Sequence, residues 1–488
     1  MKTLHINTST LGGGAEAVMR SLCSVLPAIG IGATALAGYP APGEDTFLRP
    51  NDRNGISAWC RWRGLQYYDI QKSHLLPEHP KFNDADLLHL HNLHGNYFNY
   101  WSLPVITTQK PTVWTLHDMQ AITGNCAYSL ECERWTPDTR CGQCPHLNSY
   151  PSLYRDATQQ LWHDKKTIYA HSTLTLVTPS LWLQRLVEKS MLGDQPLHCI
   201  PNGIDTGIFR HRNKAEARRR LGLPETGLLV GGCANGGVAN PWKGGQYVID
   251  AALGLKKLFP ALVFLNIGVK TAPAQLQHLE WVRHIPYVTS REELATLYAA
   301  LDILLYPTLA DNHPLVCIES LCCGTPVVGF ATGGVPEIVR HGEDGLLVPT
   351  HDGAGLIQAA ATLLQDPALR SRMGRDAAAG AAERFNLELF VKRYAKVYEE
   401  AVQRKQRVRT PFLPLKNVPL IVRSPQFMQS RLSTRPANGG RKKLGPLVSS
   451  GISWPLWQVF SLLGSSLRVV RKLRSFYRSA LGARRTLA

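Results

Sequence analysis

The strongest constraint on this fold is a repeated alternation of short apolar runs with longer stretches of helical spacing across residues 1–402. Strands that alternate with helices are typical of βαβ units, in which the strands pair in parallel. The apolar runs form two sets, at 3–7, 87–91, 112–116, 174–178 and 199–201, then at 228–233, 262–267, 303–306, 327–330 and 346–348. We therefore predict an α/β protein with two doubly wound, Rossmann-like domains.

A turn cluster at residues 201–205 (PNGID) separates the two sets and suits a hinge. It predicts an N-terminal domain at 1–204, a C-terminal domain at 205–380, and a helix at 381–402 that returns towards the N-terminal domain. In open parallel sheets, ligands bind beyond the carboxyl ends of the strands. Polar residues directly after each strand are therefore the site candidates.

Two acids follow the strand at 303–306. Asp311 lies in the loop after it, and Glu319 lies in a helix expected at 315–322. An ionised carboxylate accepts two hydrogen bonds at once, which fits a vicinal diol, and backbone amides at the start of a helix favour phosphate. Two acids at this spacing are also common as ordinary surface. The interpretation as a ligand site extends to the residues between them: Asn312, His313, Pro314, Leu315 and Val316.

Polar residues also follow strands of the first set. Gly12, Gly13 and Gly14, with Glu16, open the first expected helix, where bare backbone could approach an anion or simply form a tight turn. The cleft candidates are His91, His117, Asp118 and Asn202. A lone histidine is often only a hydrogen-bonded residue, so the alternative for each imidazole is a structural role.

In the second set, Lys243 before Gly244 is a candidate diphosphate contact or a solvated loop lysine.

The formal charge of +18 comes from the tail. Residues 403–488 hold 18 of the 54 lysines and arginines and no acids, so the 36 basic residues before them balance all 36 acids. Residues 403–453 have the composition of a flexible, basic linker. Residues 454–488 predict a basic amphipathic helix on an anionic membrane surface. A docked or disordered tail is the alternative, and nucleic acid is disfavoured because aromatic and basic residues do not interleave.

The N-terminus has no apolar segment of the kind that directs export, and no run reaches the length of a membrane span. We therefore expect a cytoplasmic protein, peripheral on the inner face of the cytoplasmic membrane.

Together these motifs resemble the retaining family 4 glycosyltransferases of the GT-B fold over residues 1–402. The similar segments are the loop at 12–16, His117, 201–205, Lys243-Gly244, 311–319, Gly324-Thr325-Pro326 and "GGVPEIVRHGEDGLLVP". The resemblance implies that Glu319 holds the ribose of a nucleotide sugar and that Asp311 and the backbone after it hold the transferred sugar. Lys243 would contact the diphosphate, and His117 would lie near the reacting sugar. No metal or other cofactor for catalysis is implied.

Two departures from the family pattern concern the donor site. The first acid is Asp311 where the family usually has Glu, and Asn240, Pro241 and Trp242 precede Lys243 where an Arg is common. A shorter acid changes which hydroxyls it reaches, and without that Arg phosphate neutralisation rests more on Lys243 and the backbone.

The segment at 118–150 is similar to a subset of the family that acts in exopolysaccharide synthesis of the colanic-acid type. It contains Cys126, Cys132, Cys141 and Cys144 with spacing C-x5-C-x8-C-x2-C. Four thiolates could close a structural zinc site. Reduced packing thiols and disulfides are the alternatives.

We therefore expect transfer of a hexosyl unit from a nucleotide sugar to a lipid-linked glycan, with retention of configuration. A nucleotide-sugar epimerase and an inactive membrane-associated scaffold are the alternatives.

Overall fold

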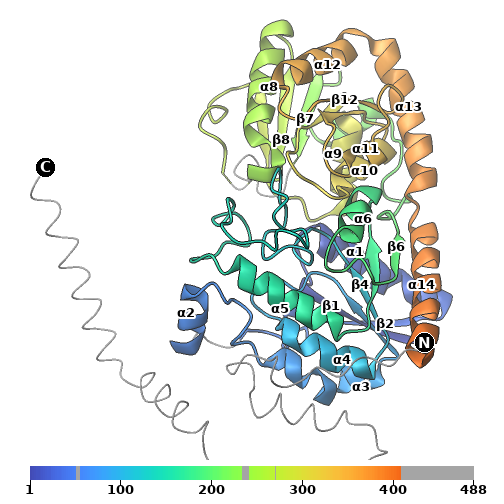
Figure 1. Ribbon diagram of the computed structural model, residues 1–488. Coiled ribbons are helices and arrows are strands. Elements are labelled where there is room, and N and C mark those ends of the chain that lie inside the picture. The colour runs from blue at the N-terminus through green and yellow to red at the C-terminus, as the bar shows by residue number, and fades with distance from the viewer. Residues whose placement is uncertain (51–54, 234–240, 270, 408–488) are drawn as a thin grey trace, which may run out of the picture.

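The computed structural model describes residues 1–50, 55–233, 241–269 and 271–407, and shows two α/β domains that meet end to end (Figure 1). Each domain contains a six-stranded sheet in which every pair of neighbours is parallel. The predicted architecture of two doubly wound domains is confirmed.

The N-terminal sheet has the order β2-β1-β3-β4-β5-β6. Its strands are β1 (Lys2–Ser9), β2 (Gly32–Tyr39), β3 (Leu87–Leu90), β4 (Thr112–Thr115), β5 (Thr175–Thr178) and β6 (Leu197–Cys199). The α-helices are α1 (Gly14–Val25), α2 (Gly55–Trp62), α3 (Pro80–Asp84), α4 (Leu103–Gln109), α5 (Thr158–Ala170) and α6 (Leu181–Glu188), with 3₁₀ turns at Leu26–Ile29, Lys72–Glu78 and Tyr100–Ser102.

The C-terminal sheet has the order β12-β11-β10-β7-β8-β9. Its strands are β7 (Leu229–Cys233), β8 (Val263–Ile267), β9 (Val282–Ile285), β10 (Ile303–Tyr306), β11 (Val327–Phe330) and β12 (Gly345–Val348). The helices are α7 (Lys214–Arg220), the 3₁₀ turn η5 (Pro241–Lys243), α8 (Gly245–Leu258), α9 (Arg291–Ala300), α10 (Leu315–Cys322), α11 (Val335–Ile338), α12 (Gly353–Gln365), α13 (Pro367–Arg384) and α14 (Leu387–Arg407).

Helices cover both faces of each sheet, which explains why the central strands of the C-terminal sheet are apolar without alternation. In β10, Ile303 and Leu305 pack with α8 and α12, whereas Leu304 and Tyr306 pack with α9, α10 and α13. The strands missed by sequence reasoning, β2 and β9, lie at the edges of their sheets. An edge strand needs less apolar surface, and β2 is rich in Gly and Ala.

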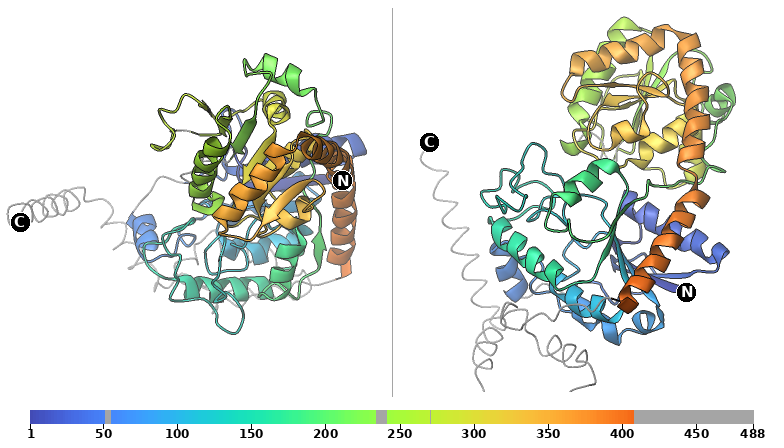
Figure 2. Two further views of the ribbon diagram at one scale, coloured as in Figure 1. Left: turned by 90° about the horizontal axis from the view of Figure 1, so that it is seen from above. Right: turned by 45° about the vertical axis from the view of Figure 1, so that its right-hand side comes forward.

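Helix α14 leaves the C-terminal domain and lies along the N-terminal sheet (Figure 2). Its residues Phe390, Tyr394 and Tyr398 pack with α1 and with one face of that sheet. The returning helix spans Leu387–Arg407 instead of 381–402, because α13 continues to Arg384 and the end of α14 stays attached: Arg404 Nη1 donates to the Leu174 carbonyl at 2.6 Å.

The predicted linker therefore begins too early, since residues 403–407 are helical. The rest of the tail, including the amphipathic helix predicted at 454–488, lies outside the described residues. Among the helices that are described, none combines the length and the apolar character needed to cross a bilayer.

Candidate active site

A cavity of about 560 Å³ lies between the domains, and residues from both domains line it. They lie at the carboxyl ends of strands of both sheets, in the hinge and at the start of α1 and α10. The predicted site residues that line it are Gly12, Gly13, Gly14, Glu16, His117, Asp118, Asn202, Lys243, Asp311, His313, Pro314, Leu315, Val316 and Glu319. The fold thus gathers candidates that are up to three hundred residues apart in the sequence, as expected for ligand sites in open parallel sheets.

Asp311 lies in the loop between β10 and α10 and already has a cationic partner. Lys243 Nζ forms an ion pair with Asp311 Oδ2, and the Tyr306 hydroxyl donates to the same oxygen at 2.5 Å. Lys243 Nζ also donates to the Tyr306 hydroxyl at 3.3 Å. The candidate phosphate contact and the candidate sugar contact are therefore neighbours, each able to exchange its partner for a ligand.

Two glycines of the GGVPE motif hold the Asp311 loop. The Gly334 amide donates to the Asp311 carbonyl at 3.1 Å. A Cβ at Gly333 would overlap the Asp311 carbonyl oxygen, and one at Gly334 would overlap the Asn312 carbonyl oxygen. This close backbone approach is why the motif requires glycine, and it fixes the position of the loop.

Glu319 lies on α10, whose N-terminal residues line the cavity. The N-cap residue Pro314 makes no side-chain capping bond, so no side chain competes with a ligand for the first amides. Glu319 Oε2 accepts from the Tyr298 hydroxyl at 3.3 Å. Burial raises the pKa of Glu319 to about 7, although nearby Arg291 and the Tyr298 hydrogen bond act in the opposite direction. The carboxyl group therefore changes charge near neutral pH.

The glycine loop faces the cavity from the N-terminal side. Gly13 is the N-cap of α1 and makes no side-chain capping bond. A Cβ built at Gly14 has no protein atom within 4 Å, so protein packing does not explain the glycine there. Tyr287 of the opposite domain donates from its hydroxyl to the Gly12 carbonyl at 3.2 Å. Burial raises the pKa of Glu16 in the first turn of α1.

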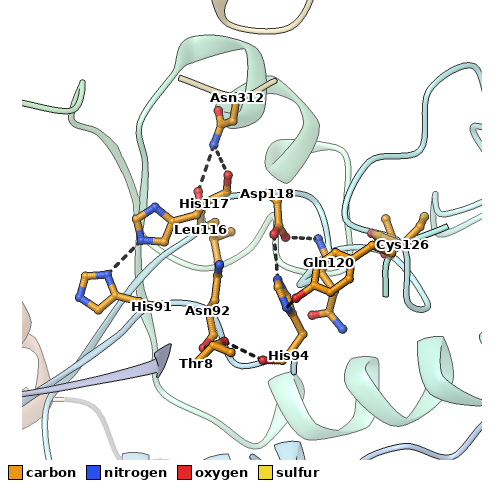
Figure 3. A network of polar contacts seen from close by, with 12 residues as sticks. Thr8, His91, Asn92, His94, Leu116, His117, Asp118, Gln120, Cys126 and Asn312 are labelled. Carbon is orange, nitrogen blue, oxygen red and sulfur yellow. Dashed lines mark hydrogen bonds and ion pairs between the residues drawn. The ribbon is translucent and has the colours of Figure 1, made fainter. Parts of the chain in front are cut away.

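His117 and Asp118 lie side by side after β4, within a network of polar contacts (Figure 3). Asp118 accepts from His94 Nε2 at 2.8 Å and from the Gln120 amide at 2.8 Å. Burial alone would raise the pKa of Asp118, but interactions with His94 and the Gln120 amide outweigh it and hold the pKa below its ordinary value. Burial lowers the pKa of His117 to about 4. At neutral pH the site therefore contains a neutral imidazole beside a carboxylate.

Two predicted site residues do not line the cavity. His91 is fully buried and bonded to His117 and His5, so its assignment to the cleft wall is wrong. Asn312 turns away from the cavity: its Nδ2 donates to the Leu116 and His117 carbonyls at 3.3 and 3.0 Å (Figure 3), and its Oδ1 accepts from Ser180. Asn312 joins the domains, and its side chain is not a donor contact.

Sequence reasoning missed other contacts that set the cleft. Glu337 accepts from the Leu181 and Trp182 amides at 2.7 and 2.6 Å, which caps α6 across the domain boundary. Asn202 in the hinge donates to the His313 carbonyl at 3.0 Å. His94, the partner of Asp118, was also missed, and its spacing from the other histidines in "HLHNLH" was the one available signal. The aromatic residues Tyr128, Tyr287, Tyr298 and Tyr306 also line the cavity and had no local signal.

The four loop cysteines are free thiols. The other three thiols lie close enough to Cys126 to contribute to the rise in its pKa. That rise is caused mainly by burial, and the pKa reaches about 12. Within the described ranges, however, the only group of three or more side chains gathered tightly enough for a metal ion is His5, His89 and His91. Structural zinc at the cysteines stays a prediction, and it requires the thiols to draw closer together.

Two Rossmann-like domains with a ligand-sized cavity between them have the GT-B architecture. The family model described as "Glycosyltransferase Family 4" matches residues 12–207, and the model "Glycosyl transferases group 1" matches residues 216–379. The chain belongs to these family 4-type glycosyltransferases.

Similar proteins support this assignment. The chain is 33% identical over 253 residues to a D-inositol 3-phosphate glycosyltransferase of Acidothermus cellulolyticus, covering 48% of this chain and 55% of that protein. It therefore spans about half the length of that relative. It is 24% identical to the putative colanic acid biosynthesis glycosyl transferase WcaC of Escherichia coli, covering 70% of this chain and 85% of that one. Among solved structures, Anabaena HepE in complex with UDP-glucose shares the fold, with a TM-score of 0.53 and 18% identity over 82% of this chain and all of that one.

Proposed function

We propose that this glycosyltransferase moves a hexosyl unit from a nucleotide-diphosphate sugar to a lipid-linked glycan in cell-surface polysaccharide synthesis, with retention of configuration and without a catalytic metal. The observation that carries the proposal is the single cavity shared by the glycine loop, His117, Lys243, Asp311 and Glu319. Their chemistry matches the parts of a nucleotide sugar: a carboxylate for a diol, a cation for phosphate and a second acid for the sugar.

In this proposal, the present partners of Asp311 and Lys243 change when the donor binds. The diphosphate competes for the Lys243 ammonium, which now pairs with Asp311. The carboxylate is then released to accept hydrogen bonds from sugar hydroxyls. The uncapped amides at the start of α10 lie along the same wall and add positive potential.

Breaking the bond between sugar and diphosphate develops negative charge on the leaving group. Preorganised donors in a cleft stabilise such charge without reorganising, and this is commonly the largest catalytic contribution. Lys243 and the α10 amides fill that role here, so no separate acid is needed to protonate the leaving diphosphate. His117, neutral because of burial, contacts the reacting sugar from the opposite wall.

The relatives favour a class of donor and a class of acceptor. HepE has this fold and is described in complexes with UDP and with UDP-glucose, which favours a UDP-sugar. WcaC, matched over most of its length, is described as a colanic acid biosynthesis enzyme, which favours an exopolysaccharide intermediate as acceptor.

The test is incubation of the purified full-length protein with labelled sugar nucleotides and a lipid extract. Label that moves to lipid supports the proposal, label found in an isomeric sugar nucleotide supports an epimerase, and no turnover supports a scaffold. The anomeric configuration of the product, read by ¹H NMR, tests retention. Activity that survives exhaustive chelation tests metal independence.

The tail supplies a separate prediction. We expect it to hold the enzyme on the anionic inner face of the cytoplasmic membrane, because residues 403–488 hold 18 basic residues and no acid. Deleting residues 408–488, beyond the end of α14, should abolish sedimentation with anionic vesicles and spare transfer to a detergent-soluble acceptor. Unchanged sedimentation would remove the tail from the account.

A further inference from the structure

Three adjacent strands contain, or continue into, a tripeptide in which Leu is preceded by Thr or His and followed by His. Thr3-Leu4-His5 lies within β1, His89-Leu90-His91 extends one residue beyond the end of β3, and Thr115-Leu116-His117 starts at the last residue of β4. Residues two apart in a strand point to the same face. The leucines pack in the core beneath α4 and α5, so the threonines and histidines face α14. A buried row of polar side chains thus crosses an otherwise apolar sheet face.

Four of these residues form one chain of hydrogen bonds that ends at the cavity. We call Thr3, His5, His91 and His117 the histidine relay. Thr3 Oγ1 lies 3.2 Å from His5 Nε2, His5 Nδ1 lies 3.1 Å from His91 Nε2, and His91 Nδ1 lies 3.0 Å from His117 Nε2 (Figure 3 shows the last link). The His5 and His91 planes are 21° apart and the His91 and His117 planes 15° apart, an arrangement compatible with in-plane bonds between successive rings.

His89 belongs to a separate branch. Its Nδ1 lies 2.8 Å from the Tyr398 hydroxyl and its Nε2 lies 2.7 Å from Thr115 Oγ1, which in turn lies 2.8 Å from the Tyr394 hydroxyl. This branch attaches α14 to the sheet and shares no hydrogen bond with the relay. It therefore supplies matched controls for the relay.

A metal ion is the competing explanation, since the ligand atoms of His5, His89 and His91 lie within 4.8 Å of one another. Every ring nitrogen of the three nevertheless has a hydrogen-bond partner, among them Thr3, Thr115 and Tyr398. A metal would have to break several of these bonds inside the core. The hydrogen-bonded arrangement explains the cluster without an added group.

Proton counting gives the relay a direction. Burial lowers the pKa of His5 to about 3 and of His117 to about 4, and that of His91 falls well below its ordinary value, so each ring carries one N–H. Thr3 donates its hydroxyl proton to the Gly32 carbonyl at 3.1 Å, and a carbonyl can only accept. With its proton on the Gly32 carbonyl, Thr3 Oγ1 accepts from His5 Nε2–H, and the same assignment passes along the chain to His117.

We propose that Thr3, His5 and His91 are positioning residues that hold His117 as its Nε2–H tautomer, with an unprotonated Nδ1 left for the ligand. His117 lines the cavity and His91 occupies its Nε2, so Nδ1 is the ring nitrogen available there. His117 then accepts a hydrogen bond from a hydroxyl of the transferred sugar. The predicted tautomer does not depend on the proposed function, whereas the identity of the ligand does.

The test is ¹H–¹⁵N correlation NMR of the full-length protein labelled in its histidines, with the His117 signal assigned by its loss in His117→Gln. The wild type should show His117 as Nε2–H. Thr3→Val removes the anchor and keeps the shape, so Nδ1–H should rise by about tenfold relative to Nε2–H, the effect of losing one buried hydrogen bond. Tyr398→Phe removes one hydroxyl from the separate branch and should leave the His117 signal unchanged.

His117 found as Nδ1–H or as an imidazolium in the wild type would overturn the proposal, even if Thr3→Val did not fold. So would an identical His117 tautomer ratio in folded Thr3→Val. In the transfer assay, Thr3→Val should lower kcat/KM in proportion to the measured fall in the Nε2–H fraction, since the lost contact is at the reacting sugar. If transfer is observed but His117 has the other tautomer, the relay is rejected and the proposed function stands. If His117 has the predicted tautomer but no transfer is observed, the proposed function is rejected and the relay stands.

Discussion

The two walls of the cleft are built in opposite ways. The C-terminal wall takes its charged groups from Asp311 and Glu319, eight residues apart, with Lys243 beside them. The N-terminal wall depends on a buried hydrogen-bonded chain whose members come from β1 and from the ends of β3 and β4. The first wall supplies charge near the surface of the cavity. The second supplies, beside the Asp118 carboxylate, a neutral ring whose orientation is fixed from inside the domain.

This difference predicts that substitutions on the two walls impair the enzyme in different ways. Charge removal on the C-terminal wall should weaken donor binding and catalysis strongly. Changes on the N-terminal wall should have smaller effects that concern geometry and proton position.

Glu319→Gln should have the largest effect. The amide keeps the shape but loses charge-assisted hydrogen bonds to a diol, each contributing about 1.5–3 kcal/mol, so kcat/KM for the donor should fall by about a hundredfold or more. Thermal unfolding should show a folded protein. Glu383→Gln, at an exposed acid on α13, is the matched control. Full turnover in Glu319→Gln would show that the donor is held elsewhere.

Gly14→Ala tests the N-terminal wall at the glycine loop. The added methyl group has no protein neighbour within 4 Å, so stability should be unchanged or slightly higher. If the space belongs to the ligand, kcat/KM should fall by about tenfold through lost close contact with the backbone. Steady-state kinetics and a melting curve together distinguish an effect on substrate from an effect on stability. Unchanged kinetics would mean that the loop contacts no substrate.

The pH dependence of donor affinity should report Glu319. Its pKa of about 7 means that the carboxylate, which accepts hydroxyl hydrogen bonds, is lost as pH falls through neutrality. Between about pH 8 and about pH 6 affinity should weaken, by at most about tenfold per unit below the pKa. Calorimetric titration measures this. The slope should flatten in Glu319→Gln, and a slope that persists there would assign the titration to another group.

Glu337→Gln should have the smallest effect, because Glu337 joins the walls without touching the cavity. Losing a charge-assisted cap at the start of α6 should cost about 1–2 kcal/mol and lower the melting temperature by a few degrees. Differential scanning calorimetry measures the shift. If the melting temperature did not change, the contact across the domain boundary would contribute nothing to stability.

The same difference between the walls decides what could be predicted from sequence. Strands at 303–306 and 327–330 and the helix at 315–322 have the predicted bounds, because an apolar run, a loop and a glycine turn delimit them locally. The same local pattern placed Asp311 after the strand and Glu319 on the helix, and both line the cavity. His91 was misassigned because its partners His5 and His117 depend on the strand order β1-β3-β4, which no local pattern specifies. Asn312 was misassigned because its contacts come from the other domain.

The central claim is that one nucleotide sugar occupies the cavity and bridges its two walls. A crystal structure with the sugar nucleotide selected by the transfer assay tests it most directly. The account predicts ribose hydroxyls on Glu319, diphosphate on Lys243 and the start of α10, and the sugar between Asp311 and His117 Nδ1. A nucleotide bound outside this cavity, or bound with Glu319 and Lys243 both unliganded, would contradict it.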